Sequence, residues 1–264
     1  MNLVAAFVQE KLALDEARWN DVLIDAPKVR LTKREVFNYY SHPKVRREML
    51  GELKGRKAIV IQTFSEGQHV RKRNEAGRPI EIRRDGRNVN DPRDFTYFTE
   101  RRATEFHPVF GKKESRLVVD LDPGDGFPWE DARQVAGDVR DLVSIMPGVK
   151  ETEVRFSGGR GFYVIGHLGQ GQSVDKSREA LKNPLRELAV AHGKLTLGPP
   201  KHDELRLDLS PMKEEGSIRG LLSLNAQTGL VSVPVVDLET FEPHRDATIE
   251  AVLGKKPKDA IHVR

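Results

Sequence analysis

The 264-residue chain predicts an α/β fold, and three observations lead to that prediction. Short apolar runs of strand length recur in its second half, a helical stripe of period 3.6 separates two of them, and Pro and Gly turns divide the elements. The alternation favours one mixed sheet with helices packed on it. No GxxxxGKS, GxxxxGKT or GxGxxG motif follows a strand, so neither a P-loop nor a dinucleotide-binding site is supported.

The start of the chain predicts helices. Residues 1–19 are amphipathic but acidic, and no basic flank precedes their apolar part. We therefore interpret them as a helix and not as a signal peptide. Thr32 and Glu35 fit a capping box at the start of "LTKREVFNYY", and Pro43 breaks or restarts the helix that follows.

A strand and a long polar segment follow these helices. Residues 57–64 predict a strand, and Ser65 to Gly67 predicts a turn. From Arg71 to Arg102 the chain carries ten Arg or Lys against six Asp or Glu, with glycines and a proline among them. We expect hairpins or an ordered loop there and not a helix.

The second half alternates strands and helices. Residues 130–146 carry an apolar stripe of helical period, which Pro147 and Gly148 end. The other elements that we expect are strands at 117–120, 152–157, 162–168, 204–209 and 229–235 and a helix at 177–192.

Composition limits the class of protein. Hydrophobic residues make up 38% of the chain, and no apolar run approaches the 18 or so residues that span a membrane. The absence of cysteine excludes disulfides and thiolate zinc sites. A net charge of +4 with 32% charged residues permits local binding of a polyanion. We expect a soluble protein of the cytoplasm.

Two aspartates in "RLVVDLDPGDG" form the first candidate site. Asp120 and Asp122 stand at i and i+2 of a strand, so both side chains point to one face with Cα atoms roughly 7 Å apart. Paired carboxylates repel unless a cation lies between them, and their oxygens suit Mg²⁺ or Mn²⁺. Asp208, in another apolar strand, is placed to be a third ligand, and Asp203 competes with it from a polar loop.

Three further segments contain residues suited to binding phosphate. The turn in "FSGGRGFYVIG" brings backbone close to an anion at Gly158 and Gly159, and Ser157 and Arg160 add donors. "GSIRGLLSLNAQTGLVSVPV" contains Arg219 before a Ser-Leu-Asn unit, and by itself it predicts a hairpin. "RATEFHPVF" contains His107, thirteen residues before Asp120, which is close enough along the chain to return to the same site.

Together, in chain order, these segments resemble the archaeo-eukaryotic primase superfamily. They are most similar to the polymerase domain of bacterial ligase D-type end-joining enzymes and its stand-alone archaeal relatives. "LTKREVFNYY" resembles the Thr-Lys helix of that family with its paired tyrosines, and "LKGRKAIVIQTFSEGQHVRKRN" resembles its Gly-Arg strand and the segment after it. "EFHPVF", "VVDLDPGDG" and "SGGRGFYV" resemble its Glu-x-His-Pro, Asp-x-Asp-Pro-Gly and Ser-Gly-Gly-Lys-Gly-x-His motifs. "IRGLLSLNAQTGLVSVPV" is closer to the small primase subunit.

The resemblance, over roughly residues 20 to 240, implies a fold and a set of roles. The fold is an α+β core of primase-polymerase type: a mixed, largely antiparallel sheet with flanking helices, in one bilobal catalytic unit. Its expected parts are an N-terminal lobe to about residue 105, a metal- and nucleotide-binding lobe over about 106–240, and a tail over 241–264. The implied metal ligands for two Mn²⁺ or Mg²⁺ ions, which are also the catalytic residues, are Asp120, Asp122 and Asp208. The implied nucleotide-binding residues are His107, Ser157, Gly158, Gly159, Arg160, Arg219 and Ser223. The implied DNA-binding residues are Lys33, Arg71 and Lys72.

The chain departs from the family pattern at several positions. Tyr163 replaces the motif histidine after the glycine turn, and Asn225 replaces the histidine of the primase Ser-Leu-His. A tyrosine donates to phosphate but carries no positive charge near neutral pH. Asp21 stands where bacterial relatives have a second phosphate-binding lysine. The gap from Asp208 to Arg219 is longer than in the primase subunit, and the zinc insert is absent.

The resemblance implies a template-directed, metal-dependent nucleotidyltransferase, a gap-filling DNA polymerase of non-homologous end joining that also inserts ribonucleotides. One alternative is a DNA primase that starts chains from two nucleotides. The other is a catalytically silent module that binds DNA ends. The expected partners are gapped or broken DNA and NTP or dNTP. The chain shows no lysine-based ligase motif, so a separate ligase and an end-binding protein are expected, with the chain a monomer associated with the nucleoid.

Overall fold

The computed structural model describes residues 31–62, 82–84, 92–100 and 103–254. The helix expected at residues 1–19, the turn at 65–67 and the end of the tail lie outside the described residues. Among the described helices, none is both long and apolar enough to cross a membrane.

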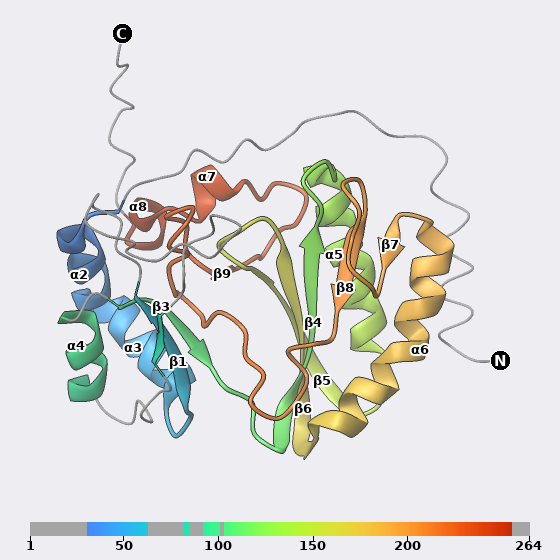
Figure 1. Ribbon diagram of the computed structural model, residues 1–264, viewed down its shortest axis with the longest axis horizontal. Coiled ribbons are helices and arrows are strands. Elements are labelled where there is room, and N and C mark those ends of the chain that lie inside the picture. Colours follow the sequence, from blue (N-terminus) through green and yellow to red (C-terminus); the bar gives the residue numbers. More distant parts are fainter. Residues whose placement is uncertain (1–30, 63–81, 85–91, 101–102, 255–264) are drawn as a thin grey trace, which may run out of the picture.

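Two sheets form the described core (Figure 1), and the second half of the chain forms one mixed sheet, as the alternation predicts. A three-stranded sheet has the order β2-β1-β3, and a six-stranded sheet has the order β7-β8-β4-β6-β5-β9. Strand pairs are antiparallel except β7 with β8. The strands of the small sheet are β1 (Ala58–Gln62), β2 (Ile82–Arg84) and β3 (Ala103–Pro108). Those of the large sheet are β4 (Lys113–Pro123), β5 (Val149–Phe156), β6 (Phe162–Ser173), β7 (Leu195–Thr196), β8 (Leu205–Asp208) and β9 (Val233–Pro234).

Three helices lie beside the small sheet (Figure 1): α2 (Lys33–Ser41), α3 (Pro43–Leu53) and α4 (Pro92–Glu100). The predicted capping box is confirmed, because Thr32 and Glu35 each accept the backbone N–H of the other. The predicted break is also confirmed, since α2 ends before Pro43 and α3 begins on it.

The prediction of loops without a helix over 71–102 is wrong for α4. Phe95 and Phe98 are buried three residues apart, which is the spacing of one helix face. Phe95 packs against Tyr40 of α2 and Phe106 of β3, with ring centroids 5.6 and 4.9 Å away. The many charges and glycines on its N-terminal side obscured this short apolar face.

Helices α5 (Trp129–Ser144) and α6 (Val174–His192) accompany the large sheet on its other side (Figure 1). Val143 of α5 packs over Gly166, which is the β6 partner of Leu117 on β4. Because side chains alternate along a strand, Asp120 and Asp122 point away from α5, on the face that looks toward the small sheet. The helix expected at 130–146 and the one at 177–192 are both confirmed within a few residues.

The last described segment is less regular than expected. Of the strand predicted at 229–235, only Val233–Pro234 forms strand β9, and Val231 makes an isolated bridge to Leu224. Two short helices follow, α7 (Pro243–Asp246) and α8 (Ile249–Val252).

Candidate active site

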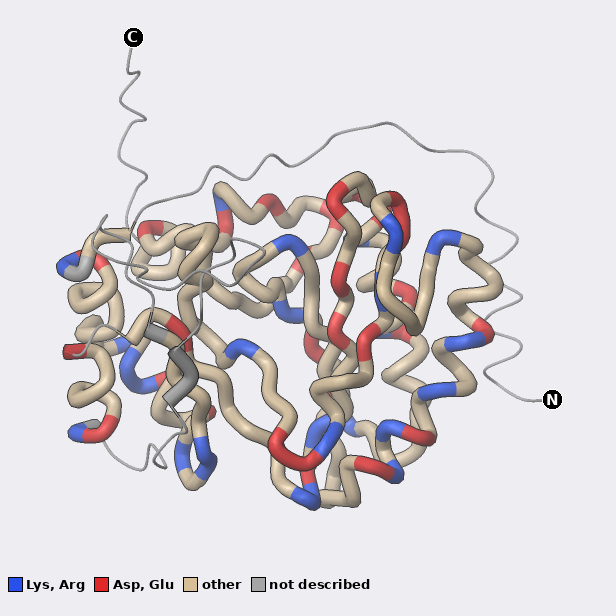
Figure 2. The backbone as a smooth tube through the Cα atoms, viewed as in Figure 1, with Lys and Arg blue, Asp and Glu red and all other residues tan. Residues whose placement is uncertain are grey.

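Two adjacent strands, β4 and β8, bring the predicted carboxylates together. In the β4–β8 register Asp120 lies opposite Asp208, and Asp122 lies opposite Arg206. On its other side Asp120 lies opposite Tyr163 of β6. Figure 2 shows the acidic positions of β4 near the middle of the molecule. Asp203, the competing third ligand, is instead in the turn before β8.

Burial and neighbouring aspartates destabilise the ionised forms of Asp120 and Asp122. Burial, together with the negative charges of Asp122 and Asp208, raises the pKa of Asp120 well above its usual range. The surrounding protein and Asp208 also raise the pKa of Asp122, although its side chain lies at the exposed rim. Elevated carboxyl pKa values in a cleft are typical of a cluster that needs a cation.

Asp208 already has partners of its own. Its two carboxylate oxygens accept hydrogen bonds from the backbone N–H and the hydroxyl of Ser210, each at 2.7 Å. The Arg206 guanidinium lies 3.0 Å from Asp208 Oδ1. As the described side chains stand, no three His, Cys, Asp or Glu form a group that could hold a metal ion. In this arrangement the Arg206 guanidinium pairs with the charge of Asp208.

The glycine turn between β5 and β6 forms the neighbouring part of the site. Gly158 has φ +79°, a left-handed conformation that a side chain would strain. The backbone N–H of Gly159 donates to Ser157 Oγ at 3.2 Å. A β-carbon at Gly161 would come within 1.8 Å of the Leu121 carbonyl oxygen, so only glycine lets this turn lie against the aspartate strand. Arg160, exposed at the turn, pairs with Asp125 of the "DPGDG" loop.

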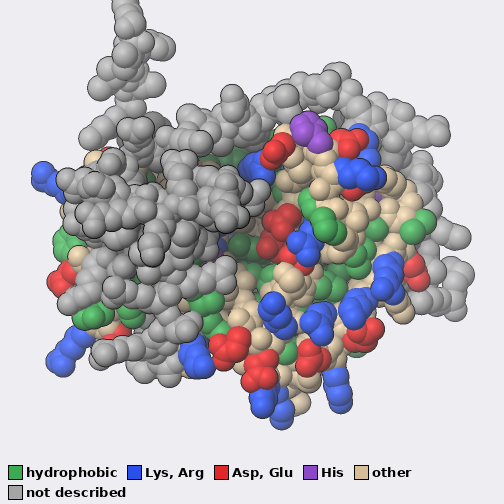
Figure 3. Space-filling view, viewed as in Figure 1, with side chains coloured by type: hydrophobic (Ala, Val, Ile, Leu, Met, Phe, Trp, Pro, Cys, Tyr) green, Lys and Arg blue, Asp and Glu red, His purple; other side chains and the backbone are tan. Residues whose placement is uncertain are grey.

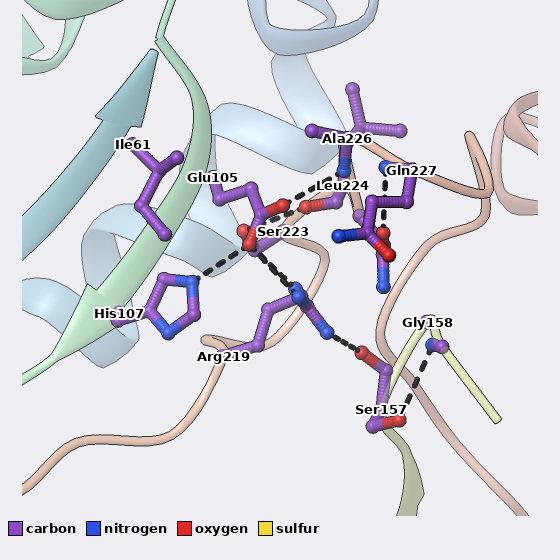
Figure 4. A network of polar contacts seen from close by, with 12 residues as sticks. Ile61, Glu105, His107, Ser157, Gly158, Arg219, Ser223, Leu224, Ala226 and Gln227 are labelled. Carbon is purple, nitrogen blue, oxygen red and sulfur yellow. Dashed lines mark hydrogen bonds and ion pairs between the residues drawn. The ribbon is translucent and has the colours of Figure 1, made fainter. Parts of the chain in front are cut away.

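Arg219 joins this turn to the small sheet (Figure 4). Its guanidinium donates to the Ser157 carbonyl and to Glu105 Oε2, with Nη2 at 2.8 Å from the carboxylate. His107 Nε2 lies 2.9 Å from the same Glu105 oxygen, and the Ala226 N–H donates to the other at 2.8 Å. Burial alone would raise the pKa of Glu105, but Arg219 and His107 lower it to about 2. Glu105 is therefore ionised and holds the Arg219 and His107 side chains in place.

An open cavity of about 630 Å³ connects these parts. Acidic side chains lie beside Lys or Arg side chains in a hollow near the centre of the face seen in Figure 3. The predicted site residues that line the cavity are Asp120, Asp122, Ser157, Gly159, Arg160 and Arg219. The predicted residues that lie outside its lining are Asp208, His107, Gly158 and Ser223.

Ser223 is buried in the protein and does not face the cavity. Its side chain is fully buried, and its hydroxyl accepts a hydrogen bond from the Phe106 N–H at 2.8 Å. The two positions that depart from the family pattern do line the cavity, namely Tyr163 and Asn225. Burial and the charge of Asp120 raise the pKa of the Tyr163 hydroxyl, which keeps it neutral.

The predicted DNA-binding residues are placed only in part. Lys33 begins α2, and its side chain lies outside the described residues, as do Arg71 and Lys72.

Sequence reasoning assigned no role to several residues of the site. Glu105 was visible only as the first letter of the Glu-x-His-Pro element, and Arg206 was visible only as a polar residue within a strand. Lys201 and His202 line the cavity from the β7–β8 loop, beside Gly124 and Gly126. The i−2 spacing of Arg206 from Asp208 is the one signal that was available, because it places both side chains on one face of β8.

Comparisons with known proteins agree with this fold. The family model of the LigD primase-polymerase domain matches residues 32–256 of the chain. Among the solved structures, 23 chains match it. One is the polymerase domain of Mycobacterium tuberculosis ligase D in complex with DNA, at TM-score 0.71 and 19% identity, covering 90% of this chain and 94% of that one. No curated protein matches the chain.

The fold and the carboxylate-lined cavity thus define a protein of the primase-polymerase class. The chain belongs to the LigD primase-polymerase domain family. Membership implies a nucleotidyltransferase of end-joining repair.

Proposed function

We propose that the chain is a template-directed, divalent-metal-dependent polymerase that fills gaps at broken DNA ends during repair. The observation that carries the proposal is a single cavity whose lining includes both carboxylates, which attract cations, and arginines, which attract anions. Asp120 and Asp122 lie on one side of it, and Arg219, Arg160 and the glycine turn lie on the other. An incoming nucleoside triphosphate with its bound cations satisfies both sides at once.

The positive side of the cavity would hold the triphosphate. Arg219 is fixed by Glu105 and the Ser157 carbonyl, so it loses little side-chain entropy when it binds an anion. Arg160 is exposed and would exchange Asp125 for a phosphate oxygen. The Ser157 hydroxyl and the backbone of the glycine turn would add hydrogen bonds.

The negative side fits divalent cations by the chemistry of its donors. Asp120 and Asp122 would hold Mg²⁺ or Mn²⁺, and Asp208 would join them after it releases Arg206 or Ser210. When bound, these cations lower the pKa of the primer 3′-hydroxyl and neutralise the leaving pyrophosphate. The protein itself orients the reacting groups, and the raised pKa values of Asp120 and Asp122 mean that these carboxylates would be ionised with the cations bound.

DNA would be the macromolecular partner. The solved relative is a complex with DNA, and we propose Lys33, Arg71 and Lys72 as phosphate contacts on the downstream strand. Phosphate contacts make affinity fall steeply with salt, so binding should weaken between about 50 and 200 mM NaCl. A separate ligase would seal the product, and the place of action would be the nucleoid.

The test offers Mn²⁺ and either NTP or dNTP on two substrates. One is a gapped duplex with a 5′-phosphate, and the other is a bare single-stranded template. We expect extension on the gap, with ribonucleotides among the substrates used. Product on the bare template alone would instead indicate a primase.

Asp120→Ala provides the matched control for this test. It should abolish extension while leaving DNA affinity within about twofold, because the carboxylate acts on chemistry and not on duplex binding. If neither protein extends either substrate and both bind DNA equally, the chain is a silent end-binding module and the proposed enzyme function is wrong.

A further inference from the structure

Glu52 of α3 does not line the cavity, but it contacts residues next to two parts of the lining, the glycine turn and Arg219. Its side chain is only 10% exposed. Glu52 Oε1 lies 2.9 Å from Arg155 Nη1 and 3.1 Å from Arg116 Nη1. Its other oxygen, Oε2, accepts the backbone N–H of Leu221. One buried carboxylate therefore connects a helix beside the small sheet to two strands of the large sheet and to a loop.

The first connection leads to the glycine turn. Arg155 lies on β5 two residues before Ser157, so the position of its side chain is tied to the position where the turn begins. Arg155 is also held by Glu153 of the same strand, at 2.8 Å. Glu52 is thus the contact that connects this part of β5 to α3.

The second connection leads to Arg219. The loop after Arg219 is strained at Leu222, whose φ of +58° is rare for a residue with a side chain. Neighbouring contacts hold that loop from the small-sheet side: Gly220 N–H donates to the Phe106 carbonyl at 2.8 Å, and the Tyr39 hydroxyl donates to the Leu222 carbonyl at 2.8 Å. Glu52 adds the contact at Leu221, between those two.

We propose that Glu52 is a positioning residue that fixes the separation between the glycine turn and Arg219. The inference rests on the proposed function, since it assigns Glu52 an effect on binding of the nucleotide triphosphate. Glu52 contacts neither the nucleotide nor the metal ligands. Its effect should therefore fall on nucleotide affinity, because a displaced charge-assisted hydrogen bond to phosphate costs roughly tenfold or more in Kd.

The test compares Glu52→Gln with Glu48→Gln. Glu48 lies one turn earlier on α3, is exposed, and pairs with Arg47. Binding of ATP with Mn²⁺ is measured by calorimetry well below the melting temperature, and Mn²⁺ binding alone by electron paramagnetic resonance. For Glu52→Gln we expect the Kd for ATP to rise about tenfold or more and the Kd for Mn²⁺ to stay within about twofold. Glu48→Gln should change neither.

Hydrogen exchange separates positioning from general loosening. In Glu52→Gln the amides of residues 217–226 should exchange faster, while those of residues 117–123 should exchange as in wild type. Equal loss of protection in both segments, or an unchanged Kd for ATP in a folded variant, would overturn the inference. If Glu52→Gln does not fold, Glu52→Asp keeps the charge but shortens the reach to Leu221, and it should show the same two changes at smaller size.

If wild-type protein binds no ATP, the proposed function fails. The exchange comparison still decides whether Glu52 positions the Arg219 loop.

Discussion

Asp120 lines the cavity, whereas Glu105 lies behind it and binds Arg219, which lines it, and the protein stabilises these two carboxylates in opposite ways. Glu105 is surrounded by Arg219, His107 and a backbone N–H, and its pKa is lowered to about 2. Asp120 faces two other aspartates, and its pKa is raised. The first carboxylate completes its charge balance within the chain, whereas the second has to acquire a cation. A structural acid and a catalytic acid can thus be distinguished by the source of the opposite charge. Side chains of the protein supply it to the first, and a bound cation supplies it to the second.

The largest effect should come from Asp120→Asn. Because the pKa of Asp120 is raised in the folded state, ionised Asp120 lowers stability at every pH above its unfolded value, near 4. The variant should therefore unfold at a higher temperature at pH 7 while losing roughly a thousandfold in nucleotide incorporation. Differential scanning fluorimetry and a gap-filling assay measure the two changes.

Asp141→Asn on α5 is the control, since Asp141 pairs with Arg140 far along the chain from the aspartates. It should leave incorporation unchanged. Lower stability with full activity in Asp120→Asn would contradict the inference that Asp120 destabilises the fold and serves catalysis.

The next effect should come from Glu105→Gln, which leaves Arg219 and His107 without their carboxylate. We expect a loss of about 3 kcal/mol in the free energy of unfolding at pH 7. Because the folded pKa is lowered, this contribution is present above the unfolded pKa of about 4.3 and disappears as pH falls toward 2. Urea titrations at pH 7 and pH 3 should show a smaller difference between variant and wild type at the lower pH.

Glu151→Gln, at an exposed position on β5, serves as the control for that series. A pH-independent difference for Glu105→Gln would mean that its charge is not what stabilises the Arg219 network.

A smaller effect is expected at Tyr163, which lies between the two carboxylate groups. Its hydroxyl accepts the backbone N–H of Arg219 at 3.4 Å, and it faces Asp120 across the β4–β6 pair. Tyr163→Phe should raise the KM for nucleotide about threefold to tenfold, which is the range of one neutral hydrogen bond. Tyr163→His should bind nucleotide more tightly at pH 6 than at pH 8, since only the protonated ring adds positive charge. Equal affinity at both pH values would contradict this.

The smallest effect should come from Arg206→Gln. Arg206 pairs with Asp208 at 3.0 Å and competes with a cation for that carboxylate. Its removal should tighten Mn²⁺ binding in the absence of nucleotide about twofold to fivefold, the range of one partly exposed ion pair. Electron paramagnetic resonance measures this change, with Arg186→Gln on α6 as the control. Weaker Mn²⁺ binding would show that Arg206 supports the site instead of competing for it.

Local patterns in the sequence predicted much of the fold. The capping box at Thr32 and Glu35 involves neighbours three residues apart, and the stripe on α5 repeats along one helix. Both patterns depend on residues that are close together in the sequence, so they can be recognised without a structure. Helix α4 was missed because its apolar face rests on two phenylalanines among many charges, and its stability comes from Tyr40 and Phe106 elsewhere in the chain.

The candidate site was predicted less completely, because its contacts join residues that are far apart in the sequence. The alternation of strand side chains places Asp120 and Asp122 on one face, but only the β4–β8 register places Arg206 opposite Asp122. Likewise no spacing relates Glu105 to Arg219, which is 114 residues away. The role of Ser223 as a nucleotide contact stays a prediction. In the structure its hydroxyl accepts a hydrogen bond from the backbone N–H of Phe106.

The "DPGDG" loop after the aspartates has one more consequence, for the mouth of the cavity. The N–H groups of Gly124 and Gly126 donate to the carbonyls of Glu204 and His202, each at 2.8 Å. A β-carbon at Gly124 would lie 2.3 Å from the Lys201 carbonyl oxygen, so the two backbones are in direct contact. The loop that follows Asp122 and the loop that precedes β8 are therefore held against each other by their backbones. A substrate that binds between these two loops and the glycine turn therefore contacts a surface that is ordered before binding, which lowers the entropy cost of binding.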